Sequence, residues 1–237
     1  MSLNINEAKL QRSRERRRNM NMKRFTAILC AAVLSLGTAN TVFANPSIRD
    51  LTIEEQKPEV SAETREILPE GKEIVVKEVE PELYEKEEVK EVVTKLNDEK
   101  QVITVEELLT TLEVDLEEEI RTESGNPIDP LEYDFITKFA DLVLTDGTTV
   151  EYDFNGEVKA VTTTVRIEAL KEVEDIRNIV LMQIDPKTGE VYFIEIREED
   201  FDPETGEITV TFPCLGPFTV LEKFPTEGET EVQTEAQ

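Results

Sequence analysis

Hydrophobic residues recur with a helical period in two short stretches near the middle of the chain. The first stretch starts at Glu85, and the second follows Thr104. Thr104 lies three residues before Glu107, which is the spacing of a capping box and predicts the start of a helix. The apolar positions that would share one face of a helix are Val89, Val92, Val93 and Leu96 in the first stretch, and Val105, Leu108, Leu109 and Leu112 in the second. Because such short helices are unstable alone in water, we expect their apolar faces to pack on each other or on the following domain.

Beyond residue 126 the pattern changes to the alternation of apolar and polar positions that is typical of β-strands. Asp146-Gly147 and Asn155-Gly156 separate such stretches, and both dipeptides favour tight hairpin turns. About seven strands are predicted between residues 139 and 222, which favours a two-sheet sandwich, with a small barrel as the alternative. The apolar positions that carry the pattern are Ala140, Leu142, Leu144, Val150, Tyr152, Phe154, Val161, Val165, Ile167, Val191, Phe193, Ile208, Val210, Phe212, Phe218 and Val220.

Two turns in the last third of the chain share almost the same sequence. They are Asp185-Pro186-Lys187-Thr188-Gly189-Glu190 and Asp202-Pro203-Glu204-Thr205-Gly206-Glu207. Pro fixes φ at the second position of a turn and Gly accepts the left-handed conformation, so each copy predicts a turn that precedes a strand. The last strand is expected to begin at Leu215-Gly216-Pro217-Phe218, where Gly and Pro favour an edge or a corner of a sheet.

Residues 45–83 combine several prolines with many glutamates and few aromatic residues. A segment of this composition buries too little apolar surface to fold alone, which predicts a flexible acidic tether. Within it, Ile74 and Val76 alternate as in a strand that could add to a partner sheet. The predicted organisation is a signal peptide at 1–44, a disordered acidic tether at 45–83, a short helical segment at 84–124, a β-sandwich domain at 126–224 and a disordered acidic tail at 225–237.

Residues 1–44 have the order of features that marks a secretory signal. A basic stretch precedes the apolar run Phe25–Leu36, and Val42-Phe43-Ala44 offers a cleavage site. We therefore expect Sec-type export, cleavage after Ala44 and an extracellular location. An uncleaved signal anchor is the alternative, because residues 25–44 are nearly long enough to span a bilayer. Met1, Met20 and Met22 are all candidate start residues.

The chain is strongly acidic, with 53 Asp and Glu against 26 Lys and Arg and a formal net charge of −27. Residues 1–44 are basic, so the remainder is more acidic than the whole. Nucleic-acid binding requires Lys and Arg that neutralise phosphates, and no basic patch follows residue 44, which excludes nucleic-acid partners. Anionic membrane surfaces are disfavoured for the same reason, so we expect membrane contact only through an uncleaved signal segment.

Several residue types that common active sites use are missing. The chain has no His and no Trp, and Cys214 is the one cysteine beyond residue 44. These absences remove Ser-His-Asp and Cys-His arrangements and His-ligated zinc. Cys214 is expected to be a small buried apolar residue. We predict that the protein is not an enzyme, and the sequence assigns no catalytic, cofactor-binding or metal-binding residue and no cofactor.

The β-rich part carries a resemblance to a known group of domains. Tyr133-Asp134-Phe135-Ile136-Thr137-Lys138-Phe139, the two Asp-Pro-x-Thr-Gly-Glu turns and Phe212-Pro213-Cys214-Leu215-Gly216-Pro217-Phe218 resemble segments of immunoglobulin-like modules in secreted and surface proteins of Gram-positive bacteria. The resemblance covers under half of the chain and consists of turn and core positions. It implies an antiparallel immunoglobulin-like β-sandwich and an exported protein, and it transfers no catalytic or binding residue.

Together these observations predict a secreted, non-catalytic β-sandwich module with an interaction or spacer role. Its partner would be an extracellular protein or a component of the cell wall. One alternative is a calcium-stabilised surface module with weak Ca²⁺ binding, because Glu198, Glu199 and Asp200 add carboxylates near the repeated turns. Another is a hydrolase that uses two carboxylates, which would need a cleft.

Overall fold

The computed structural model describes residues 52–98 and 100–224. The predicted signal peptide and the acidic tail at 225–237 lie outside the described residues. The described part forms one compact unit. None of its helices has the length and apolar character needed to cross a membrane.

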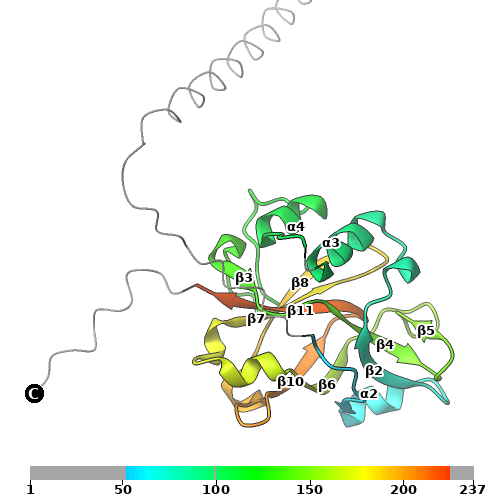
Figure 1. The fold of residues 1–237 in the computed structure, drawn as a ribbon. Helices are drawn as coiled ribbons and strands as arrows, with labels where there is room; N and C mark the ends of the chain where they lie inside the picture. The colour runs from blue at the N-terminus through cyan, green and yellow to red at the C-terminus, as the bar shows by residue number, and fades with distance from the viewer. Residues whose placement is uncertain (1–51, 99, 225–237) are drawn as a thin grey trace, which may run out of the picture. The chain divides into compact units, whose positions relative to one another are not determined.

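The strands form two antiparallel sheets, so the prediction of a mainly β protein is confirmed (Figure 1). The four-stranded sheet has the order β1 (Glu59–Val60), β6 (Val161–Arg166), β10 (Glu207–Phe212) and β9 (Phe201–Asp202). The seven-stranded sheet has the order β2 (Glu73–Glu78), β4 (Ala140–Thr145), β11 (Gly216–Lys223), β7 (Ile179–Ile184) and β8 (Val191–Glu195), while β3 (Tyr133–Phe135) pairs with β11 and β5 (Val150–Glu151) pairs with β4.

In the described residues three short α-helices accompany the sheets: α2 (Ala62–Ile67), α3 (Glu87–Asn97) and α4 (Val105–Thr111). The two predicted helices are confirmed as α3 and α4. The α4 capping box forms, since the Thr104 hydroxyl accepts from the Glu107 amide and the Glu107 carboxylate accepts from the Thr104 amide. Short 3-10 segments occur as η1 (Pro81–Leu83), η2 (Pro130–Glu132), η3 (Glu168–Glu172), η4 (Ile176–Asn178) and η5 (Glu198–Asp200).

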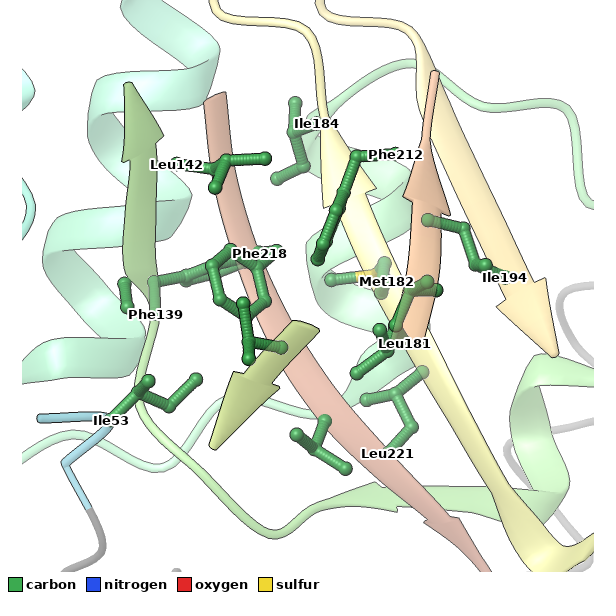
Figure 2. Close-up of a cluster of buried hydrophobic side chains, with 14 of the residues drawn as sticks. Ile53, Phe139, Leu142, Leu181, Met182, Ile184, Ile194, Phe212, Phe218 and Leu221 are labelled. Atoms are coloured by element: carbon green, nitrogen blue, oxygen red, sulfur yellow. The ribbon is translucent and has the colours of Figure 1, made fainter. Parts of the chain in front are cut away.

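The seven-stranded sheet is a middle layer. All six residues of β7 are buried, whereas β6 and β10 bury only alternate positions and leave the others partly or fully exposed. In Figure 1, α3 and α4 lie on one side of the seven-stranded sheet, and β6 and β10 lie on the other. The rings of Phe212 and Phe218 meet edge-on between the sheets, with centroids 5.0 Å apart. Figure 2 shows these two rings in the core with Leu181 of β7.

The outer face of the four-stranded sheet is polar. Thr162 and Thr211 face each other with hydroxyl oxygens 2.8 Å apart, and Thr164 and Thr209 form a second pair at 2.8 Å. Hydroxyl pairs of this kind stabilise neighbouring strands. β6 and β10 therefore have the alternation that their sequence predicts, with apolar residues on the inner face and threonines on the outer face, and Thr163 is the one buried threonine of these two strands.

The prediction of a flexible tether at 45–83 is wrong for the described residues of that segment. β2 pairs with β4 over six residues, with Ile74 opposite Leu144 and Val76 opposite Leu142, and Ile74, Val75 and Val76 are buried. Gln56 also bridges to Val76 on the free edge of β2. The segment cannot fold alone, but β4 offers it a partner more than sixty residues further along the chain, and pairing buries its few apolar side chains.

The helical segment at 84–124 belongs to the same core rather than to a separate unit. Val89, Val92, Val93 and Leu96 of α3 and Val105, Leu108 and Leu109 of α4 are all buried in one hydrophobic cluster with the β-strands. Most of that cluster comes from residues beyond 126. The helices thus pack on the following strands, which is one of the two arrangements that their length required.

Two strand predictions need correction. Asn155 and Gly156 do form a tight turn, with φ values of 57° and 87° and a bridge between Phe154 and Glu157. The chain then leaves the seven-stranded sheet, because β6 pairs with β1 and β10 rather than returning beside β5. Ala140, Leu142 and Leu144 lie on β4, but Asp141 and Val143 between them are buried too, so this strand is covered on both faces.

The last strand is a central strand and not an edge strand. β11 pairs with β7 on one side and with β4 and β3 on the other. Pro217 is accommodated because pairing with β7 begins only at Phe218. A Cβ on Gly216 would lie 2.5 Å from the Ile184 carbonyl oxygen, so glycine permits this close approach of the two strands.

Candidate functional site

One carboxylate lies inside the helix-covered side of the seven-stranded sheet. Asp141 of β4 is fully buried, with Lys77 of β2 and Pro217 of β11 opposite it in register. Its Oδ1 accepts a hydrogen bond from the Tyr84 hydroxyl at 2.8 Å. Its Oδ2 accepts from the Tyr152 hydroxyl at 2.8 Å and from the backbone N–H of Glu80 at 3.2 Å. Asp141 therefore has three donors, and we call this group with Tyr84, Tyr152 and the Glu80 amide the Asp141 cluster.

Local structure brings the two tyrosines to this carboxylate. Tyr84 ends η1 and precedes α3, and its N–H donates to the Pro81 carbonyl at 3.1 Å. Tyr152 directly follows β5, which is returned to β4 by a turn whose Asp146 Oδ1 accepts from the Thr148 and Thr149 amides at 2.8 Å. The two rings meet edge-on with centroids 5.5 Å apart. The cluster joins the segment before α3 to the β4–β5 hairpin, since Asp141 lies 57 residues beyond Tyr84 and 11 residues before Tyr152.

Burial dominates the electrostatics of the cluster. Burial raises the pKa of Asp141 to about 6, although hydrogen bonds from Tyr152, Tyr84 and Glu80 and the charge of Lys77 all act in the opposite direction. Burial and the neighbouring carboxylate also raise the pKa of Tyr84 and Tyr152 far above the ordinary value. Both phenols therefore stay protonated and act as donors.

A groove lies beside the cluster, at the end of the seven-stranded sheet that carries β2. The groove is a hollow of about 1020 Å³, and we call it the β2 groove. It is lined by 55–57, Glu73, Val75, Lys77, Glu80, Leu83, Thr145 and Gly147–Val150. A smaller hollow of about 230 Å³ shares Leu83 and Val150 with it and is lined by Tyr152 and Lys187. Lys77, Glu80 and Tyr152 thus connect the buried cluster to open surface.

The groove offers both apolar and charged groups. Leu83 is 46 % exposed, and Val75 of β2 lines the same hollow. Around them lie ion pairs, which join Lys57 to Glu73 at 2.7 Å and Lys77 to Glu80. Beside the smaller hollow, Lys187 pairs with Asp153. Such exposed pairs add little to stability, but they supply hydrogen-bond partners of both signs to a ligand.

No family model matches the chain, and no curated protein and no solved structure shows significant similarity to it. The resemblance to immunoglobulin-like modules therefore stays a prediction, and the function has to be argued from the geometry.

The sequence assigned no site residue, and it did not identify the Asp141 cluster. The available signal was one acidic residue in the apolar run Ala140-Asp141-Leu142-Val143-Leu144. An acidic side chain in a strand buried on both faces needs donors. The sequence alone could not show that Tyr84 and Tyr152 supply them, because one lies before α3 and the other follows a different strand.

The prediction for Cys214 is confirmed, since this residue is a free and buried cysteine. Burial is the main cause that raises the pKa of its thiol, and the nearby charges of Asp185, Glu190 and Glu123 raise it further. The reactive form of cysteine is the thiolate, so this environment disfavours nucleophilic chemistry at Cys214.

The two repeated turns form as predicted. In each, the Asp Oδ1 accepts a backbone N–H bond two residues on, from Lys187 at 2.8 Å in the first copy and from Glu204 at 2.9 Å in the second. Within residues 52–98 and 100–224, no group of three or more acidic or Cys side chains is arranged to hold a metal ion.

Proposed function

We propose that the protein is an exported, non-catalytic module that binds an extracellular protein or a component of the cell wall in the β2 groove. The observation that carries this proposal is the groove itself, where the exposed side chain of Leu83 and the largely buried Val75 lie among Lys and Glu side chains. Ligand sites in proteins commonly combine an apolar surface with a few polar groups in this way. The features of residues 1–44 support export.

Non-catalytic binding is favoured by the state of the groups that could do chemistry. Asp141, whose pKa of about 6 would suit an acid or base, has no exposed surface and already has three donors. A substrate atom would have to reach within about 3 Å of its oxygens, which the surrounding side chains prevent. The thiol of Cys214 is buried in its protonated form.

The proposal includes an immunoglobulin-like origin for the two-sheet body. Support comes from the antiparallel sheets that pack through Phe212 and Phe218, and from the sequence resemblance in residues 133–139 and 212–218. Helices α3 and α4 and strand β2 would then be additions, since they cover one face and one edge of the larger sheet. Strand β2 and the chain segments on either side of it supply much of the lining of the β2 groove, so the binding site would be specific to this chain.

The test measures binding of the full chain to isolated Gram-positive cell walls and to immobilised secreted proteins. Leu83→Ala and Lys57→Glu alter exposed groove residues, and we expect each to weaken saturable binding by roughly fivefold or more, since about 1 kcal/mol corresponds to a factor of five. Leu131→Ala is the matched control, because Leu131 is 58 % exposed and does not line the groove. Equal losses with Leu131→Ala would contradict the groove as the site, and no saturable binding at all would favour a spacer role.

A further inference from the structure

The chain contains no histidine, so it lacks the side chain that ordinarily changes charge near neutral pH. Histidine is the one side chain whose ordinary pKa lies between about 5 and 8. A conformational response in that range must therefore come from a side chain with an altered pKa. The Asp141 cluster holds a carboxylate away from water where the η1–α3 segment meets the β4–β5 hairpin.

We propose that the Asp141 cluster is a pH-sensitive clasp, which ties the η1–α3 segment and the end of β5 to β4 and rearranges when Asp141 takes up a proton. The clasp is closed by two phenol hydroxyls and one backbone amide that all donate to the same carboxylate. Tyr84 brings the η1–α3 segment, and Tyr152 brings the end of β5. Neither segment pairs with the other through a strand ladder.

Protonation cannot leave this arrangement unchanged. The ionised carboxylate is an acceptor only, and all three neighbours are donors. A proton on Oδ1 would face the hydroxyl of Tyr84, and a proton on Oδ2 would face both the hydroxyl of Tyr152 and the amide of Glu80. The amide cannot become an acceptor. One phenol therefore has to accept a hydrogen bond from the protonated carboxyl and turn its own O–H toward another partner. The neutral cluster therefore holds at least one tyrosine less firmly.

Among the charged and titratable groups around Asp141, Asp141 itself is the one that we expect to change protonation in this pH range. Lys77 lies directly opposite on β2 and favours the ionised form, but its ammonium pairs with the carboxylate of Glu80. On the other side β11 contributes Pro217, which has no charge. Tyr84 and Tyr152 are the titratable groups from the remaining neighbours, and burial keeps both protonated. Burial of Asp141 itself raises its pKa to about 6. The protonation of Asp141 therefore falls in the pH range in which histidine ordinarily titrates.

The clasp acts on the surface next to it. Lys77 and Glu80 line the β2 groove, and Tyr152 lines the smaller hollow beside it. A change at Asp141 is thus transmitted to both hollows through groups that touch it or its donors. The clasp itself does not depend on the proposed binding function, and its test needs no ligand.

The direction of the pH effect follows from the raised pKa. The folded protein binds the Asp141 proton more tightly than the unfolded chain, whose Asp has its ordinary pKa near 4. Between about pH 4 and pH 6, rising pH therefore lowers the contribution of this residue to stability, and above pH 6 the contribution is constant. Asp141→Asn removes this dependence because the side chain cannot ionise.

Tyrosine absorbance and fluorescence provide the readout, because the chain has four tyrosines and no tryptophan. We expect the full chain to show a single one-proton step in the tyrosine signal, with a midpoint near pH 6, between pH 4.5 and 7.5. The step should disappear in Asp141→Asn. Tyr152→Phe removes a hydrogen bond that favours the ionised form, so the midpoint should move to higher pH by roughly half a unit or more.

Two control variants keep the test decisive. Asp134→Asn changes a second carboxylate, which is partly buried and whose pKa is also raised by burial. Tyr133→Phe removes a phenol outside the cluster. Both should keep the step at the midpoint of the unmodified chain. If Asp141→Asn does not fold, the midpoint shift in Tyr152→Phe still tests the clasp. A tyrosine signal that is flat across this range, or a step that persists in Asp141→Asn or vanishes in Asp134→Asn, would overturn the proposal.

Discussion

The turns at 185–190 and 202–207 have nearly the same sequence and the same local hydrogen bonds, but they lie in different surroundings. In both, the glycine N–H donates to the aspartate carbonyl at 2.8 Å, and the glycine has a positive φ of 77° or 71°. Asp185 is buried, whereas Asp202 is exposed. The comparison shows that the motif sets the shape of the turn, while the rest of the fold sets how much each residue in it matters.

The space around the two glycines differs most. A Cβ on Gly189 would have its nearest neighbour at 3.9 Å, in the side chain of Val89. A Cβ on Gly206 would lie 2.6 Å from the Ile167 carbonyl oxygen and 3.2 Å from Lys171 Cγ. The Ile167 N–H also donates to the Gly206 carbonyl at 2.9 Å, so the second turn is held against the end of β6 and cannot withdraw freely.

The largest difference between the turns is therefore expected from alanine at the glycine. Gly206→Ala combines an unfavourable positive φ with a backbone clash, and we expect it to lower the free energy of unfolding by about 3 kcal/mol or more. Gly189→Ala has the same strain without the clash and should cost about 1 kcal/mol. Urea denaturation of both variants measures these values, and equal losses would show that the close approach at Ile167 relaxes easily.

Removal of the aspartate side chain should destabilise the protein more at the first turn than at the second, which is the reverse of the order expected for the glycine variants. Asp185 is 4 % exposed and its Oδ1 accepts from the Lys187 and Thr188 amides, so Asp185→Ala leaves these donors without a partner in a partly buried place. We expect a loss of about 1–2 kcal/mol in the free energy of unfolding. Asp202→Ala exposes its turn amides to water and should have a smaller effect in the same denaturation experiment. A larger loss at Asp202 would contradict the role of burial.

At the exposed turn, the contribution of Asp202 to stability should change at low pH. Hydrogen bonds from the Glu204 amide and from Thr205 lower the pKa of Asp202 in the folded protein. The folded pKa lies below the unfolded value, so Asp202 stabilises the protein above about pH 4, and this contribution is lost as the pH falls through the folded pKa. We expect the melting temperature of Asp202→Asn to approach that of the unmodified chain between about pH 4 and pH 2. A constant difference between the two proteins over this range would contradict the pKa shift.

The smallest effect is expected from calcium, for which the two turns should behave alike. In both, the aspartate Oδ1 already accepts an amide N–H bond, and the turns lie at the ends of different sheets. Addition of about 5 mM Ca²⁺, or of a chelator, should change the melting temperature by less than about 1 °C, although extracellular calcium modules bind in the millimolar range. An increase of several degrees with Ca²⁺ would instead support the calcium-stabilised alternative.

Local signals in the sequence predicted local structure well. The α4 capping box, the apolar faces of α3 and α4 and both repeated turns depend on residues a few positions apart, and all of them form. The alternation of β10 is also confirmed, because that strand has one face in the core and one in water. In these cases the periodicity of the chain and the burial of the side chains follow from the same geometry.

Predictions failed where the partner is distant or where both faces of a strand are covered. The composition of residues 45–83 predicts a flexible tether, and only the alternation of Ile74 and Val76 indicates a possible strand, because the stabilising contact of β2 is its ladder with β4. Gly216 and Pro217 favour an edge or a corner of a sheet, although β11 is a central strand. The Asp141 cluster combines η1, β4 and the end of β5, and its hydrogen bonds depend on the assembled fold rather than on any spacing in the sequence.

The central place of β11 has a mechanical consequence. Near residue 52 the described chain is held first by the bridge from Gln56 to Val76 and by the two-residue strand β1, so few backbone hydrogen bonds resist a pull there. Near residue 224 it is held by β11, which is bonded along both sides, so a pull there loads many hydrogen bonds together. Force applied between these two points would release the amino-terminal side first and leave the carboxy-terminal strand anchored in the middle layer.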